Sequence, residues 1–397
     1  MKTARIEDVS EFVLDGTHGS PVRVEAGVPV LSAQHVKHGV LSYDTDRFTT
    51  EEEYHAFRKR MPFMAGDLLL TIVGTIGRSA VLTDVRPLVF QRSVAIIRPK
   101  ITVLDARFLF QVTQSQNFQS QLARSSNTSS QAGVYLGKIK EVTIPLPPLA
   151  EQRRIAEVLD RAEALRAKRR GALAQLDSLT QSLFLDLFGD PATNPKRWPI
   201  RQIGDLLESA SYGTSEKSGS EGQFPVLRMN NITRTGDMDF TELKFMDLPD
   251  SLHDRYLVRN GDVLFNRTNS VELVGKTGIY RETKPMAYAG YLVRLRMNKE
   301  NDPEYLARFL NLDYSKRMLR GMCKSIIGMA NINASEIQKM KIPQPPIAQQ
   351  REFARRVTAV EALKTAQRAS LAELDALFAT LQHRAFRGEL RAPAEPT

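Results

Sequence analysis

The chain has 397 residues, of which 42% are hydrophobic and 25% charged, a composition typical of a folded globular protein and not of a disordered one. A single cysteine, Cys323, excludes an internal disulfide and any metal site built from several thiolates. No apolar run reaches the about 20 residues of a transmembrane helix, and the N-terminus lacks a signal-peptide core, so we expect a cytoplasmic location. The formal net charge of +10 favours a polyanionic partner without identifying one.

The first 148 residues are predicted to form a mixed α+β domain. Short runs rich in Val, Leu and Ile at residues 68–73, 81–82 and 94–97 are typical of β-strands. Residues 105–124 have the apolar spacing of a helix. The stretch GTIGR at 74–78 lacks the third glycine and the following helix of a phosphate-binding loop, so turn glycines between strands explain it better.

A proline-rich joint leads from this domain into a long helix. Pro145 and Pro147 favour an extended approach, and Pro148 suits a first helical turn, where a missing N–H costs nothing. Residues 149–187 are rich in good helix formers, with apolar residues at a heptad-like spacing that would bury against a partner helix. A helix of this length would be about 58 Å long.

The joint and the helix occur twice. Residues 144–165 read IPLPPLAEQRRIAEVLDRAEAL and residues 342–363 read IPQPPIAQQREFARRVTAVEAL, at an offset of 198 residues with no gap. Upstream, GDLLL at 66–70 corresponds to GDVLF at 261–265. Two repeats of this size indicate duplicated domains, because solenoids need at least three short repeats. The predicted division is a first domain at 1–148, a central long helix at 149–190, a second domain at 191–346, a distal long helix at 347–390 and a flexible tail at 391–397.

The sequence contains no convincing catalytic motif. It has no G-x-x-x-x-G-K-[ST] phosphate loop, no H-E-x-x-H zinc helix and no N/D-P-P-aromatic stretch of an amino-methyltransferase. The six histidines are scattered, and the four in the first domain have no equally rich counterpart in the second. We therefore expect no metal site and no catalytic site on this chain.

The tandem arrangement resembles the specificity (S) subunit of type I restriction–modification systems. The resemblance covers essentially the whole chain and rests on I-P-x-P-P-[LI]-A-x-Q-R opening a long helix twice, each time after a domain of comparable size. It implies an α+β fold of two similar target recognition domains separated by two long helices that form an antiparallel coiled coil, with a pseudo-two-fold internal repeat. The same symmetry predicts that the segment after the second helix packs near the N-terminus.

The resemblance also implies a function. Each recognition domain would read one half of a bipartite double-stranded DNA target, while the helices would set the spacer and dock two methyltransferase (M) subunits. Restriction/translocase (R) subunits would join for cleavage. This chain would be non-catalytic and would bind no cofactor, with S-adenosylmethionine on the partner subunit and no membrane involved.

Polar and basic residues near the repeated motifs are the candidates for DNA contacts, because such side chains bind phosphates and base edges. The first-domain candidates are Thr17, His18, Gln34, His35, Lys37, Arg78, Arg92 and Ser93. The second-domain candidates are Tyr212, Thr214, Arg228, Asn230, Asn231, Arg267, Asn269 and Lys276. Polar loops at 125–135 and 323–333 could add contacts. For each residue the alternative is a solvated side chain or a turn former, as for Asn230 and Asn231.

Two other functions are compatible with this sequence. A scaffold with two protein-binding heads on a coiled coil would need no nucleic acid, although the basic charge argues mildly against it. A self-contained modification enzyme would require a methyl-donor or nuclease motif, which the sequence lacks.

Overall fold

The computed structural model describes residues 1–126, 133–326 and 329–390. It divides into a first unit, Met1–Arg169 with Ser370–Thr397, and a second unit, Arg170–Ala369. Each unit contains an α+β domain and a part of each long helix. The predicted tail 391–397 lies outside the described residues, as do 127–132 and 327–328 within the two candidate loops.

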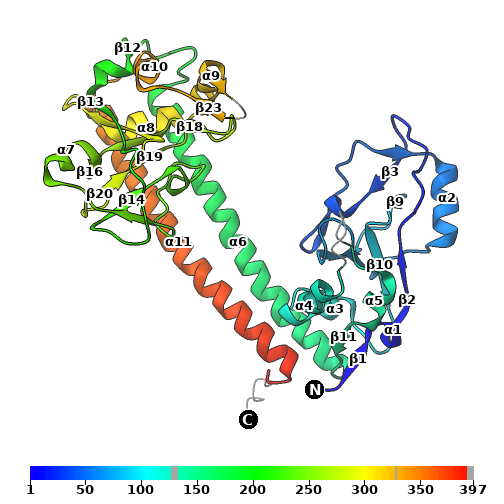
Figure 1. Ribbon diagram of the computed structural model, residues 1–397. Helices are drawn as coiled ribbons and strands as arrows, with labels where there is room; N and C mark the ends of the chain where they lie inside the picture. Colours follow the sequence, from blue (N-terminus) through cyan, green and yellow to red (C-terminus); the bar gives the residue numbers. More distant parts are fainter. Residues whose placement is uncertain (127–132, 327–328, 391–397) are drawn as a thin grey trace. The chain divides into compact units, whose positions relative to one another are not determined.

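The first unit is built on an antiparallel sheet of four strands in the order β2–β10–β7–β8, of which β2 and β10 are labelled in Figure 1. A smaller layer, β6–β3–β9, contains the parallel pair β3 and β9. Alternate side chains of β7 serve two cores: Leu68 and Leu70 pack with the helices, and Leu69 packs with the smaller layer. The strands are β1 (Thr3–Arg5), β2 (Ser10–Asp15), β3 (Val28–Leu31), β4 (Val36–Lys37), β5 (Val40–Leu41), β6 (Phe48–Thr49), β7 (Leu68–Thr71), β8 (Ser79–Val81), β9 (Val89–Phe90), β10 (Val94–Pro99) and β11 (Thr143–Pro145).

The second unit repeats this plan. Its main sheet has the order β13–β21–β17–β19, and its smaller layer, β15–β14–β20–β16, contains the parallel pair β14 and β20. Side chains of β17 again alternate between two cores, with Val263 and Phe265 on one side and Leu264 on the other. The strands are β12 (Ile200–Gln202), β13 (Leu207–Tyr212), β14 (Phe224–Leu227), β15 (Lys244–Met246), β16 (Leu257–Val258), β17 (Val263–Asn266), β18 (Thr268–Asn269), β19 (Thr277–Ile279), β20 (Met286–Tyr288), β21 (Leu292–Met297), β22 (Lys324–Ile326), β23 (Met329–Asn331) and β24 (Lys341–Pro343).

The helices follow the same order in both units. The segment 105–124, expected to be helical, is broken once, where Ser115 starts a new helix by accepting the Phe118 N–H. The corresponding segment 302–320 is also broken once. The α-helices are α1 (Ile6–Val9), α2 (Glu51–Arg60), α3 (Ala106–Thr113), α4 (Gln116–Arg124), α5 (Leu136–Glu141), α6 (Leu149–Phe188), α7 (His253–Tyr256), α8 (Pro303–Asn311), α9 (Asp313–Met322), α10 (Ala334–Gln338) and α11 (Ile347–Arg387). Short 3₁₀ turns are η1 (Ala33–His35), η2 (Ile203–Leu206), η3 (Met229–Asn231) and η4 (Asp250–Leu252).

A buried glutamine explains why the joint is repeated. Gln152, in the first turn of α6, donates from Nε2 to Pro147 O and Val103 O, both at 2.8 Å, and its Oε1 accepts the Asp105 N–H at 2.9 Å. Gln350 of α11 donates to Pro345 O at 2.8 Å and accepts the Asp302 N–H at 2.8 Å. Each glutamine therefore links the first turn of a long helix by hydrogen bonds to the preceding proline segment and to the N-cap residue of α3 or α8.

A Gly-Asp pair is a second feature that occurs in both domains. Gly66 and Gly261 have φ values of +92° and +90°, a conformation that favours glycine. The aspartate that follows is almost fully buried and forms a bidentate ion pair, Asp67 with Arg98 and Asp262 with Arg296, at 2.7–2.8 Å. Such pairing satisfies a carboxylate that would otherwise be costly to bury.

The two long helices run antiparallel within each unit. In the first unit Arg166 of α6 donates to Asp375 of α11 at 2.6 Å, and in the second unit Lys364 of α11 contacts Asp177 of α6 at 2.8 Å. These two ion pairs are related by the repeat offset of 198 residues. Both helices end at a glycine with positive φ, Gly189 and Gly388, as is common at helix C-termini.

The end of α11 lies beside the start of the chain; the tail 391–397, which the internal symmetry predicts to pack near the N-terminus, lies outside the described residues. A Cβ on Gly388 would lie 3.2 Å from the side chain of Met1, and Leu390 packs against the hydrophobic core of the first unit. The carbonyl of Leu390 also accepts a hydrogen bond from Arg154 of α6. Residues 388–390 thus lie near Met1 and near the start of α6.

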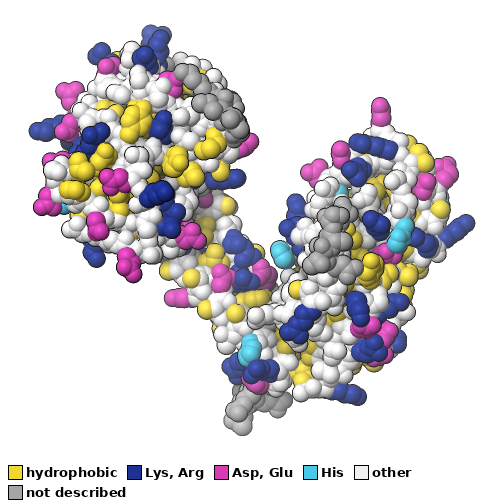
Figure 2. Space-filling view, in the orientation of Figure 1, with side chains coloured by type: hydrophobic (Ala, Val, Ile, Leu, Met, Phe, Trp, Pro, Cys, Tyr) yellow, Lys and Arg dark blue, Asp and Glu magenta, His cyan; other side chains and the backbone are white. Residues whose placement is uncertain are grey.

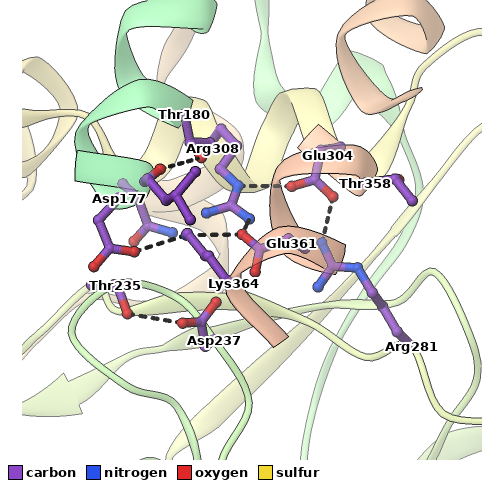
Figure 3. Close-up of polar contacts among 12 residues, drawn as sticks. Asp177, Thr180, Thr235, Asp237, Arg281, Glu304, Arg308, Thr358, Glu361 and Lys364 are labelled. Carbon is purple, nitrogen blue, oxygen red and sulfur yellow. Dashed lines mark hydrogen bonds and ion pairs between the residues drawn. The ribbon is translucent and has the colours of Figure 1, made fainter. Parts of the chain in front are cut away.

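A network of charged side chains fastens α8 to the long helices in the second unit (Figure 3). Lys364 contacts Asp177 at 2.8 Å and Glu361 at 3.0 Å, although its side chain is only 2% exposed. Arg308 of α8 contacts Glu361 at 3.1 Å and Glu304 at 2.7 Å. The network ends at the surface in Arg281, which pairs with Glu304. Lys364 therefore lies at the point where three elements meet.

Replacing Lys364 by methionine should destabilise the second unit, because Glu361 loses an ion-pair partner on its own helix. Breaking a buried pair costs about 3–5 kcal/mol, and we expect the lower end of this range because water can hydrate the half-exposed Asp177. Urea unfolding followed by the fluorescence of Trp198, the only tryptophan, measures the change. The control Arg355→Met removes an exposed pair with Glu352 and should cost less than about 1 kcal/mol. Equal effects of the two substitutions would contradict the prediction.

Candidate nucleic-acid interface

A three-segment junction follows strand β2 in the first unit. It consists of residues 16–17, 31–35 and 90–93. The Thr17 N–H donates to Phe90 O at 2.7 Å, the Arg92 N–H donates to Thr17 O at 3.0 Å, and the Gln91 N–H donates to Leu31 O at 2.8 Å. Backbone hydrogen bonds therefore join three segments that are far apart in the sequence, and most of the first-domain candidates lie on or beside them.

The second unit has the same three-segment junction at residues 213–214, 227–231 and 288–291. The Thr214 N–H donates to Tyr288 O at 2.9 Å, the Gly290 N–H to Thr214 O at 2.7 Å and the Ala289 N–H to Leu227 O at 2.9 Å. The three bonds match those of the first unit one for one. The duplicated domains thus share a backbone arrangement at the place where the candidate residues gather.

One glycine in each junction is required by packing. A Cβ on Gly16 would lie 2.2 Å from the carbonyl oxygens of Phe90 and Gln91, and a Cβ on Gly213 would lie 2.3 Å from that of Tyr288. Real Cβ atoms do not approach backbone oxygens so closely. Glycine therefore permits the close crossing of two segments, which explains its presence in both halves of the repeat.

Two of the candidate DNA-contact residues are buried and form hydrogen bonds within the protein. His35 is 3% exposed, and its Nδ1 accepts the Ser32 N–H at 2.9 Å; burial lowers the pKa of its imidazole. Asn231 is 1% exposed, and its Oδ1 accepts the Arg228 N–H at 2.8 Å while its Nδ2 donates to Asp239 O at 2.8 Å. The two side chains occupy equivalent positions and close the 3₁₀ turn of each junction.

Lys276 and Thr214 also face inward. The Lys276 ammonium donates to the carbonyls of Met229, at 2.7 Å, and Ile232, and burial lowers its pKa. Thr214 is 4% exposed, and its hydroxyl accepts the Glu216 N–H at 3.1 Å. Their internal hydrogen bonds give these two side chains a structural role in the second unit.

The remaining first-unit candidates differ in exposure. Gln34, Lys37 and Arg92 are exposed, and so is His18, which contacts Asp15 at 2.8 Å. Thr17, Arg78 and Ser93 are half-buried; the Ser93 hydroxyl accepts the Ala33 N–H at 3.0 Å. The junction therefore brings Thr17, Gln34, Arg92 and Ser93 together, whereas Arg78 lies on the β7–β8 hairpin.

In the second unit an arginine lies against an aromatic ring. The Arg267 guanidinium lies 4.8 Å from the Tyr212 ring centroid, and its Nη2 donates to Asn331 Oδ1 at 3.1 Å. Tyr212 is 42% exposed, and its hydroxyl accepts the Ala334 N–H at 2.9 Å. Of the other candidates, Asn230 is exposed, whereas Arg228 and Asn269 are half-buried.

Tyr291 is an exposed aromatic side chain that we did not predict. It is 52% exposed, and its carbonyl accepts the Arg267 N–H at 3.0 Å. At the repeat offset of 198 it corresponds to Ser93, which was a candidate. Applying the offset to every candidate would therefore have identified Tyr291 from the sequence.

Basic and acidic side chains are interspersed over the visible surface of each unit (Figure 2). Several basic side chains are neutralised locally, such as Arg166 by Glu163 and Asp375, and Arg161 by Glu157. Among the described residues, no three His, Cys, Asp or Glu side chains are placed to hold a metal ion. No helix within the described part of the chain is long and apolar enough to span a membrane. The junctions offer hydrogen-bond donors, acceptors and aromatic faces, which are the groups of a recognition surface.

Together the fold and the two junctions define a duplicated α+β protein with two related polar surface sites. The chain belongs to the family of the type I restriction modification DNA specificity domain, whose model matches residues 1–176 and 195–375. The two matched regions correspond to the two copies of the internal repeat.

Individual relatives agree with this family. The chain is 27% identical over 299 residues to the type I restriction enzyme EcoKI specificity subunit of Escherichia coli K12; the match covers 69% of this chain and 64% of that protein. A solved chain from work on complex assembly and conformational transition of the type I R-M system is 19% identical, with a TM-score of 0.55 and 98% of each chain covered. The type I S subunit from M. genitalium is 14% identical, with a TM-score of 0.56, covering 97% of this chain and 96% of that one. At these identities the solved structures show the fold alone.

Replacing Gly213 by alanine should destabilise the second unit by at least about 1–3 kcal/mol, because the new methyl group overlaps two carbonyl oxygens. Urea unfolding monitored by Trp198 fluorescence gives the value. Gly219→Ala is the control, since its nearest neighbour would be 3.8 Å from the added Cβ. If both variants had the same free energy of unfolding as the wild type, the close approach at Gly213 would not require a glycine.

The buried Lys316 should make stability depend on pH. Burial lowers the pKa of Lys316 to about 7, while its ammonium donates to Gly275 O. In the unfolded chain the lysine keeps this proton up to about pH 10.4. Between about pH 7 and pH 10.4 the unfolded state therefore binds one more proton than the folded state. The free energy of unfolding then rises with pH, by at most about 1.4 kcal/mol per pH unit. Below pH 7 both states are protonated and the contribution is constant.

Lys316→Gln should remove this rise and stabilise the second unit at pH 7. Gln119 occupies the equivalent place in the first unit and donates to Gly77 O at 2.9 Å, so the amide fits the fold. Urea unfolding between pH 6.5 and 9.5, followed through Trp198, tests the slope, with the exposed Lys339→Gln as control. A wild-type profile that is already flat above pH 7 would refute the assignment.

Proposed function

We propose that the chain is the DNA sequence-recognition subunit of a type I restriction–modification complex. The observation that carries this proposal is the duplicated three-segment junction, in which identical backbone hydrogen bonds present different exposed side chains. Two related surfaces with different chemistry suit two different half-sites of a bipartite target. Family membership and a formal net charge of +10 support DNA as the polyanion.

The proposal assigns the long helices a mechanical and a docking role. They would set the spacer between the two half-sites and bind two methyltransferase subunits, one for each copy of the repeat. Near-identical joints at Gln152 and Gln350 support two equivalent partner sites. Restriction/translocase subunits would complete the assembly in the cytoplasm.

In this proposal the chain itself is non-catalytic. Methyl transfer from S-adenosylmethionine would take place on the partner subunit, and cleavage on the restriction subunit. The contribution of this chain is selection: it holds hydrogen-bonding groups where only the correct bases complement them. The protein-scaffold alternative gains no observation of its own from the described residues.

Exchange of one recognition domain within the chain tests the function. Replacing residues 3–145 by a second copy of residues 200–343 keeps the strand register at the joint, because Thr3 pairs with Pro145 as Ile200 pairs with Pro343. We expect the selected DNA to contain the second half-site twice, with the spacer unchanged. Binding selection from random duplexes, with the methyltransferase subunits present, reports the sequence.

The reciprocal exchange, with the first domain duplicated, is the matched control and should double the first half-site. A wild-type assembly without sequence preference would contradict the proposed function. A single exchange that altered both half-sites would contradict the assignment of one reading domain to each half.

A further inference from the structure

At and beside the two junctions, four neighbouring positions differ in side chain although the backbones match. The Ile72 N–H donates to Ser93 O at 2.9 Å, and the Arg267 N–H donates to Tyr291 O at 3.0 Å. The next bond also matches, since the carbonyls of Ile72 and Arg267 accept from Val134 and Ile332 at 2.8 and 2.9 Å. The equivalent pairs that differ are Ile72 and Arg267, Asp15 and Tyr212, Ser93 and Tyr291, and Gly133 and Asn331.

The change from Ile72 to Arg267 replaces a core residue by a charged one. Ile72 is 4% exposed and belongs to the hydrophobic core of the first unit. Arg267 is half-buried at the same backbone position in the second unit. The surrounding changes accommodate it: Tyr212 provides a ring for stacking and Asn331 an acceptor oxygen. Isoleucine at the same backbone position in the first unit indicates that the fold does not require an arginine there.

The guanidinium of Arg267 is fixed in orientation. The Tyr212 ring lies 4.8 Å away, Asn331 Oδ1 accepts from Nη2 at 3.1 Å, and Gly290 O lies 3.4 Å from Nη1. The Tyr212 hydroxyl is in turn held by the Ala334 N–H, which fixes the ring. A guanidinium has five N–H donors, so each terminal nitrogen keeps one N–H beyond these contacts. Tyr212, whose ring lies against this group, and Tyr291, whose carbonyl accepts the Arg267 N–H, are both exposed.

A planar pair of donors held in one orientation matches a planar pair of acceptors. In the major groove only guanine presents two adjacent acceptors, N7 and O6, and a bidentate arginine is the commonest way to read them. A phosphate also accepts two parallel N–H bonds from a guanidinium, but such a contact carries no base preference, so a preference for guanine distinguishes the two.

We propose that Arg267 reads a guanine in the half-site of the second unit, with Tyr212 as the residue that positions its guanidinium. The first unit reads its half-site without an arginine at this position. This inference rests on the proposed function and adds the base chemistry of one of its two half-sites.

The test compares base preferences of the full assembly at every position of the selected DNA. The wild type should favour guanine at one position of the second half-site by about fivefold to a hundredfold over other bases. Arg267→Ile, which copies the first unit, should abolish this preference and leave all other positions unchanged. Tyr212→Leu should weaken the preference, whereas Tyr212→Phe, which keeps the ring, should retain most of it.

Arg317→Ile, an equal loss of charge at an exposed site on α9, is the control and should keep the guanine preference. The inference is overturned if Arg267→Ile selects the same bases as the wild type. It is also overturned if binding to all sequences weakens alike and the log–log salt slope falls by about 0.9, the result expected for a phosphate contact. Retention of the other positions of the second half-site shows that the second unit of each variant is folded, and retention of the first half-site separates this failure from failure of the proposed function.

Discussion

The position of each long helix relative to its own domain depends on one buried glutamine. The first N–H groups of a helix lack intrahelical partners, and here the segment before the helix is rich in prolines, which have carbonyls to satisfy but no N–H to donate. Gln152 and Gln350 solve this problem because one amide can accept from the cap of the neighbouring helix and donate to the proline carbonyls. Both side chains are fully buried, so any displacement would leave several polar groups unpaired. The repeated sequence of the joint therefore has a structural role: it connects each domain to its long helix.

In the proposed function, a duplicated protein that reads two different sequences keeps its scaffold while changing its contacts. The scaffold consists of backbone hydrogen bonds, the glycine crossing and the buried Asp67–Arg98 and Asp262–Arg296 pairs, and all of these occur in both units. Side chains that the backbone does not require are free to differ. The cluster of four differing positions around Arg267 is therefore one chemical difference between the two surfaces. An arginine with a fixed plane adds directional recognition that a mobile surface lysine does not supply.

The sequence predicted the duplication, the two long helices and the mixed α+β domains, because each depends on local composition or on a long repeat without gaps. It could not separate reading residues from structural ones. His35, Asn231 and Lys276 have the right chemistry for DNA contacts, but their partners include backbone groups, and those of Lys276 lie more than forty residues away. The carbonyl partners of Lys276 can be placed only when the fold that brings these segments together is known. The placement of Arg267 against Tyr212 likewise depends on segments joined only by the fold.

The distribution of charge supports the same separation of roles. In the second unit Lys364, Arg308, Arg281 and Arg368 are each paired with carboxylates, contributed by Asp177, Glu361, Glu304 and Asp237. Four cations and four anions cancel, so these groups fasten α8 and the 233–238 loop to the helices without attracting a polyanion. The net charge of +10 therefore resides in the other basic side chains. Phosphate attraction would then come from these side chains, while base discrimination would depend on oriented groups such as the guanidinium of Arg267.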